Sequence, residues 1–122
     1  MICPYCNKEA KYGPNEEWYG RRFGKSYMCY YCKDCDAYVG THQNTTKALG
    51  TMANKELRNM RMKCHALFDP LWKQGNMKRS MAYKMISDEM GKQVHIGESD
   101  LETCKRILEY LTDYTTKQTK LL

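Results

Sequence analysis

The sequence predicts an α+β fold, in which short β-hairpins at the N-terminus pack against three or four C-terminal α-helices. Two observations support this prediction. Aromatic residues and turn formers alternate over residues 1–42, as is typical of short strands. From residue 50 onward the apolar residues recur at helical spacing instead. We therefore expect one domain over residues 1–122, with a helical part at residues 50–114 and a polar tail at residues 115–122.

The N-terminal strands are predicted from aromatic clusters that turn formers separate. Gly and Pro within residues 12–15 indicate a turn. Aromatic residues favour strands at residues 17–19 and 25–31, with a hairpin turn at residues 24–25 between them. Residues 37–39 have the composition of a further short strand.

The first helix is predicted from apolar residues at spacings of 4, 3, 4 and 3, with Thr51 as its N-terminal cap. These apolar positions are Ala53, Leu57, Met60, Cys64 and Leu67. We expect the helix to end near Phe68, because Pro70 disfavours helical geometry at Asp69. Asp69 is then expected to cap a short second helix, with Pro70 in its first position and a stop at residues 75–76.

Two more helices are predicted toward the C-terminus. The third covers residues 79–90 and ends at Gly91, and residues 93–97 form an extended connector. Ser99 followed by Glu102 has the pattern of a capping box, which predicts the start of the last helix. The apolar stripe of that helix consists of Leu101, Cys104, Leu108 and Leu111.

Composition and charge exclude several classes of protein. The chain has 122 residues, of which 42% are apolar, and a net charge of +6. No apolar run approaches the roughly 20 residues of a membrane span. The N-terminus lacks the basic and apolar segments of a signal peptide, so we expect a cytoplasmic protein. In that reducing compartment seven cysteines indicate metal binding rather than disulfides.

Two Cys-x-x-Cys pairs predict a metal site. Cys3 and Cys6 form the first pair, and Cys32 and Cys35 form the second. Four thiolates in two turn-forming pairs are typical of a zinc ribbon, which is a closed tetrahedral site for one structural Zn²⁺. Backbone N–H groups in each tight turn can point at the sulfurs and stabilise their negative charge.

Two residues leave alternatives for the ligand set open. Cys29 and Cys32 are also spaced as Cys-x-x-Cys, although the turn formers at residues 33–34 favour the pairing of Cys32 with Cys35. His42 is an alternative ligand. The spacing alone does not decide between these sets.

Four other residues with reactive side chains are expected in structural roles. Cys64 and Cys104 lie on apolar helix stripes, so we expect them in the core. Near His65 and His95 no nucleophile or carboxylate has a spacing that indicates a catalytic site. We expect each histidine to be buried against a backbone carbonyl. Phosphate loops and catalytic motifs are absent, and a four-thiolate zinc leaves no position for a bound water. We therefore expect a non-enzymatic protein with no catalytic residue and no small-molecule substrate.

Several short stretches, taken in order, carry a resemblance. They are residues 3–6, 19–24, 32–40, 49–58, 65–66, 68–72, 82–83 and 95–97. Together they resemble a phage and prophage family of zinc-finger-containing domain proteins of unknown function. The resemblance implies a bacteriophage protein in a bacterial host cell, and it implies no reaction. The zinc ligands that it implies are Cys3, Cys6, Cys32 and Cys35.

The chain departs from this family pattern near the expected site. The family has a cysteine directly before the histidine that matches His42, whereas this chain has Thr41 there and an additional Cys29. The role of His42 therefore stays open at this point.

Basic and aromatic residues at two places predict contacts with a partner. The first group lies around the expected hairpin and can stack bases and neutralise phosphates. Its members are Trp18, Tyr19, Arg21, Arg22, Phe23 and Lys25. The second group, Lys55, Arg58 and Arg61, lies opposite the apolar stripe of the first helix and can face phosphates. An ordinary solvated helix face explains the same pattern.

These groups predict nucleic-acid binding, with one alternative. A basic surface can also meet an acidic groove on a host protein. The chain is then a phage-encoded inhibitor that blocks a host machine for nucleic-acid processing or antiviral defence, for example of the CRISPR type. Nine methionines are compatible with this alternative, because Met suits adaptable contact surfaces.

Overall fold

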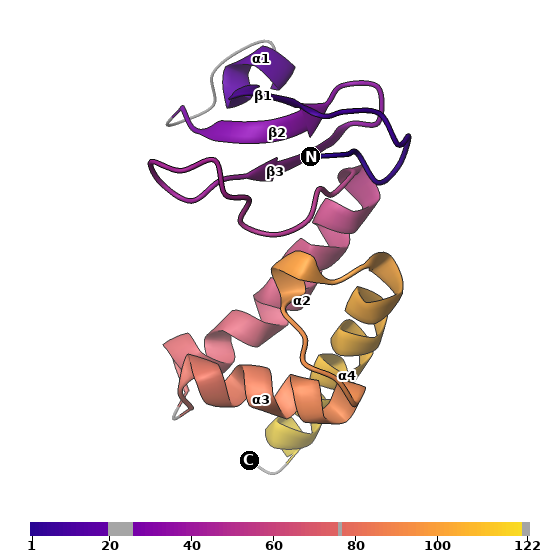
Figure 1. Cartoon of the computed structure of the whole chain (residues 1–122). Coiled ribbons are helices and arrows are strands. Elements are labelled where there is room, and N and C mark those ends of the chain that lie inside the picture. Colours follow the sequence, from indigo (N-terminus) through magenta and orange to yellow (C-terminus); the bar gives the residue numbers. More distant parts are fainter. Residues whose placement is uncertain (20–25, 76, 121–122) are drawn as a thin grey trace. The chain divides into compact units, whose positions relative to one another are not determined.

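The computed structural model describes residues 1–19, 26–75 and 77–120. The chain divides into two compact units, an N-terminal unit (Met1–Glu56) and a C-terminal unit (Leu57–Leu122). The first contains a three-stranded antiparallel sheet and the second contains helices (Figure 1). The predicted α+β class is confirmed. A single domain over residues 1–122 stays a prediction.

The sheet of the N-terminal unit has the strand order β1-β2-β3. Its strands are β1 (Lys11–Pro14), β2 (Met28–Cys32) and β3 (Ala37–Gly40). Both pairs are antiparallel, and Tyr30 in the central strand lies opposite Tyr12 and Val39. The strands at β2 and β3 agree with the sequence prediction. The expected hairpin turn at residues 24–25 lies outside the described residues.

The segment before β2 differs from the prediction, since residues 12–15 do not turn and residues 17–19 are not a strand. Residues 11–14 pair as β1, and the chain then forms a short helix, α1 (Asn15–Tyr19). Buried Asn15 anchors this helix, because its Oδ1 accepts a hydrogen bond from the Tyr27 backbone N–H at 3.0 Å. The Trp18 ring packs against Tyr38 with centroids 4.8 Å apart. These tertiary contacts override the strand propensity of the aromatic residues.

The apolar core of the N-terminal unit is small. One buried cluster consists of Cys3, Ala10, Ala37, Val39 and Met52, and Cys6, Cys32 and Cys35 pack against it; Cys29, Tyr31 and Ala53 are also buried. A unit of this length can bury only a limited apolar area, so metal binding can add to its folding free energy.

The first helix of the C-terminal unit, α2 (Lys55–Lys73), is longer than predicted and begins later. It continues through Pro70, so neither the stop near Phe68 nor the separate short helix exists. Proline removes one backbone N–H, but the helix resumes with a hydrogen bond from Gln74 N–H to the Pro70 carbonyl at 3.1 Å. Phe68 is fully buried, and its burial outweighs the local disadvantage of the proline.

The helix α3 (Arg79–Met90) agrees with the prediction. Gly91 adopts the left-handed conformation, with φ of 72°, and its N–H bonds the Asp88 carbonyl. The expected extended connector is partly wrong, because residues 96–98 form a 3₁₀ turn, η1 (Ile96–Glu98). The fully buried Ile96 fixes this turn to the core of the unit.

The last helix, α4 (Leu101–Lys120), starts where predicted but with another cap. Asp100 Oδ1 accepts the Thr103 backbone N–H at 2.8 Å, whereas the Ser99 hydroxyl donates to the His95 carbonyl at 2.7 Å. Among the side chains of this helix that the structure describes, Cys104, Ile107 and Leu111 are fully buried, whereas Leu101 and Leu108 of the predicted stripe are only half-buried. The helix also continues into residues 115–120, which were predicted as a polar tail.

The long helices α2 and α4 have 19 and 20 residues. Both carry many charged residues along their length. Among the described residues, no helix combines the length and the hydrophobicity that crossing a membrane requires.

Candidate metal centre

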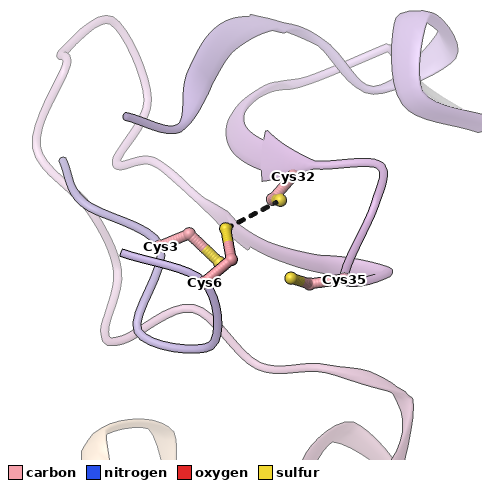
Figure 2. Close-up of side chains that lie close together, drawn as sticks. All are labelled: Cys3, Cys6, Cys32 and Cys35. Atoms are coloured by element: carbon pink, nitrogen blue, oxygen red, sulfur yellow. Dashed lines mark hydrogen bonds between the residues drawn. The ribbon is translucent and has the colours of Figure 1, made fainter. Parts of the chain in front are cut away.

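Four cysteine sulfurs meet at one end of the sheet. The Sγ atoms of Cys3, Cys6, Cys32 and Cys35 all lie within 4.8 Å of one another. The Cys6 and Cys32 sulfurs are 3.8 Å apart. A tetrahedral zinc with Zn–S bonds of about 2.3 Å places its sulfurs about 3.8 Å apart, so the observed spacing fits this metal. Figure 2 shows the sulfurs of both pairs around a shared space.

Two turns, each ending in a residue of positive φ, present these sulfurs. In the first, the Asn7 N–H bonds the Cys3 carbonyl at 2.9 Å, and in the second the Asp36 N–H bonds the Lys33 carbonyl at 3.2 Å. Asn7 and Asp36 each follow the second cysteine of a pair, and both adopt positive φ, at 61° and 51°. Asn and Asp tolerate this left-handed conformation better than most residues. The repeated pattern Cys-x-x-Cys-Asn/Asp is a sequence signal for the two turns.

The environment acts on these thiols in opposite directions. The backbone N–H of Lys8 is the main cause that lowers the pKa of Cys6. Burial is the main cause that raises the pKa of Cys32, and it raises the pKa of Cys35 to about 12 together with the neighbouring thiols. Four adjacent thiolates repel one another, so a divalent cation is needed to hold all of them in the deprotonated form.

The ligand set is closed. With four cysteine sulfurs a zinc ion has its full tetrahedral coordination, and no position is left for water or a substrate. The four cysteines can therefore bind one zinc ion with a structural role. The prediction that these four cysteines can bind one zinc ion is confirmed.

The two alternative ligands lie elsewhere. Cys29 is fully buried, and it is three residues from Cys32 on β2, so their side chains point to opposite faces of the sheet. Burial is the main cause that raises the pKa of Cys29 to about 11, with Glu17 and Glu16 adding to the effect. His42 is exposed in the loop after β3. Among the described residues, the group that can hold a metal is the four-cysteine cluster alone.

Of the four other reactive side chains, the two cysteines are buried as predicted and the two histidines are not. Cys64 and Cys104 are fully buried as expected, and the Cys64 thiol donates to the Cys104 carbonyl at 3.2 Å. The two histidines are not buried. The side chain of His65 is 41% exposed, with Nδ1 3.2 Å from Oδ1 of Asp69. His95 is exposed and packs its ring against Tyr83.

The predicted partner-binding residues of the first group are only partly described. Arg21, Arg22, Phe23 and Lys25 lie outside the described residues, as does the side chain of Tyr19. Trp18 is half-buried and packs against the sheet through Tyr38. Its position favours a structural contribution.

The second group is divided by the structure. Lys55 is exposed at the start of α2 and Arg58 is half-exposed. Arg61 lies at helical spacing between the buried Leu57 and Cys64, and its guanidinium donates to the Ser99 carbonyl at 2.9 Å. The prediction that Arg61 lies opposite the buried stripe is therefore wrong.

The sheet and its four-thiolate cluster define a small zinc-binding protein. A family model described as a zinc-finger-containing domain matches residues 1–114. The chain therefore belongs to this zinc-finger-containing family. No curated protein and no solved structure matches the chain.

Proposed function

We propose that this chain is a non-enzymatic, zinc-stabilised protein that binds single-stranded nucleic acid in the cytoplasm of a phage-infected bacterium. The setting rests on the resemblance to phage proteins. The closed metal site supports a structural role for zinc, which leaves function to the protein surface.

The exposed tyrosines of the N-terminal unit carry this proposal. Tyr5, Tyr12 and Tyr27 are 40%, 40% and 39% exposed. Aromatic rings at the surface provide stacking platforms for unpaired bases. The net charge of +6 favours a polyanionic partner.

A second candidate function is binding to a host protein, such as part of a nucleic-acid-processing or antiviral-defence machine. A groove of about 850 Å³ in the C-terminal unit favours it. Leu67, Leu71 and Met81 are among the apolar residues that line this groove. A surface of this kind suits an apolar segment of another protein.

Salt-dependent binding tests the first proposal. We expect a fluorescein-labelled single-stranded oligonucleotide to bind with an affinity that falls steeply between about 50 and about 200 mM salt. Reversal of Arg21, Arg22, Lys55 and Arg58 to Glu is expected to weaken binding and to flatten the slope of log affinity against log salt by about 0.7 per lost contact. Zinc content and far-UV circular dichroism verify that the reversed variant is folded, so that a loss of binding reports on the charges.

Affinity capture from host lysate separates the two candidates. Capture of nucleic acid that nuclease treatment removes supports the first proposal. A specific protein that survives the nuclease treatment, together with no oligonucleotide binding, contradicts it and supports the second.

A further inference from the structure

We propose that a recess beside Tyr12, between the sheet and the loop after β3, is a site for one unpaired nucleobase. This inference rests on the proposed nucleic-acid function and assigns a place to it. The recess has a volume of about 780 Å³. Sites for small ligands have volumes of about 300–1,000 Å³, so a base and its sugar fit this recess. Tyr12, Tyr27 and Met28 line one side, and residues 41–46 line the other.

One wall of the recess is aromatic and supported from behind. Tyr12 on β1 lies directly opposite Tyr30 on β2, with ring centroids 5.0 Å apart. The Tyr30 hydroxyl donates to the Thr46 carbonyl at 2.7 Å, which fixes the Tyr30 ring against the loop. Tyr12 is thereby held by Tyr30 while 40% of it stays exposed. A ring that is fixed and exposed can stack a base without losing much conformational freedom.

The opposite wall is a loop that its own backbone holds in place. The His42 N–H bonds the Lys47 carbonyl at 2.9 Å, and the Thr45 N–H bonds the His42 carbonyl at 3.1 Å. Asn44 adopts a positive φ of 61° at the tip. The hydroxyls of Thr41 and Thr45 bond backbone carbonyls. The loop is therefore ordered by contacts that leave other side chains available.

Several polar side chains of this loop remain for a ligand. His42, Gln43 and Asn44 are exposed, and within the described part of the chain their side chains make no hydrogen bond. An amide group offers both donors and acceptors, and imidazole offers one of each. These groups match the edge of a base, which also presents donors and acceptors side by side.

The charged residues around the recess predict on which side the sugar-phosphate backbone passes. The exposed Lys47 follows the loop on one side. On the other side the Ser26 hydroxyl donates to both carboxylate oxygens of Glu16, at 2.7 and 2.8 Å. A phosphate is attracted by the lysine and repelled by the carboxylate, so we expect the backbone of the strand to pass on the Lys47 side.

An abasic oligonucleotide provides the test. A fluorescein-labelled 12-mer of thymidines and a 12-mer with the same phosphates but no bases are titrated with the zinc-loaded protein. We expect the base-containing strand to bind at least about fivefold more tightly, which is the lower end of what one stacked base contributes. Tyr12→Leu is expected to lower this ratio several-fold, whereas Tyr12→Phe, which keeps the ring, retains it. Zinc content and far-UV circular dichroism verify that both variants are folded.

Each other outcome has a definite meaning. If both strands bind equally to the natural protein, or if Tyr12→Leu keeps the preference, the recess is not a base site, while the proposed nucleic-acid function stands. If neither strand binds at low salt, the proposed function itself is wrong, and the recess then accepts at most a side chain of a protein partner.

Discussion

Single residues decide the identity of the metal site. Cys29 and Cys32 have the same spacing as a ligand pair, yet a strand turns residues three apart to opposite faces. Cys29 is fully buried as a neutral thiol with its pKa raised to about 11, while Cys32 faces the cluster. The choice between them could be predicted, because Lys33 and Asp34 form turns more readily than two tyrosines do.

We expect Cys35→Ser to abolish stoichiometric zinc binding and Cys29→Ala to retain it. Serine is a poor ligand for zinc, whereas Cys29 contributes to packing alone. Elemental analysis of the purified variants measures the zinc content. A Cys29→Ala protein without zinc beside a fully loaded Cys35→Ser protein contradicts the assigned ligand set.

The left-handed residue after each cysteine pair gives a second prediction at this scale. Asn7 has a φ of 61°, a conformation that β-branched residues strongly disfavour. We expect Asn7→Val to weaken zinc binding about tenfold, because left-handed geometry costs about 1–2 kcal/mol there. Asn7→Gly is the matched control and is expected to bind zinc like the natural protein. Competition with a chromophoric chelator measures both affinities, and equal affinities for Val and Gly contradict the argument.

At the scale of elements, the ends of helices could be predicted from the sequence where neighbouring residues alone determine them. Gly91 ends α3 because its left-handed conformation satisfies the last carbonyls, and no distant residue is involved. The continuation of α2 through Pro70 depends instead on the burial of Phe68 in the core of its unit. The helix at residues 15–19 depends on Asn15 bonding to Tyr27, twelve residues away. Such tertiary contacts are invisible in a local pattern.

The cap of α4 was predicted one residue too early, and the correction has a measurable consequence. The Thr103 backbone N–H and hydroxyl are the main causes that lower the pKa of Asp100. A carboxyl whose pKa is lowered by folding stabilises the folded state at pH values above the ordinary carboxyl pKa. This stabilisation is lost as the pH falls through the pKa of the folded state.

We therefore expect Asp100→Ala to lower the free energy of unfolding by about 1 kcal/mol near neutral pH. The difference from the natural protein is expected to shrink below about pH 4, where the Asp100 carboxyl of the unfolded chain takes up a proton, and to vanish once the pH lies below the lowered pKa of the folded state. Asp100→Asn keeps an oxygen acceptor without the charge and is expected to lose less stability. Urea unfolding followed at 222 nm measures all three proteins, and a pH-independent difference for Asp100→Ala contradicts the assignment.

At the scale of the whole molecule, the two units differ in what stabilises them. Most of the buried apolar residues of the N-terminal unit are small, such as Ala10, Ala37 and Ala53, and the buried Cys3 belongs to the metal-binding cluster as well. The C-terminal unit buries larger side chains, among them Phe68, Ile86, Ile96, Ile107 and Leu111, all fully inaccessible. Hydrophobic burial can therefore support the helices directly, whereas the sheet depends on metal binding for its folding free energy.

This difference predicts separate responses to metal removal. We expect a zinc chelator to unfold the N-terminal unit, because its four thiols then lose the cation that holds them together. The helices of the C-terminal unit are expected to persist, because their core contains no ligand of the metal. Two-dimensional NMR of the backbone amides measures both responses in one sample, and Cys35→Ser without chelator is the control that should give the same spectrum. Loss of dispersion in both units at once contradicts this prediction, since it means that zinc supports the folding of the whole chain.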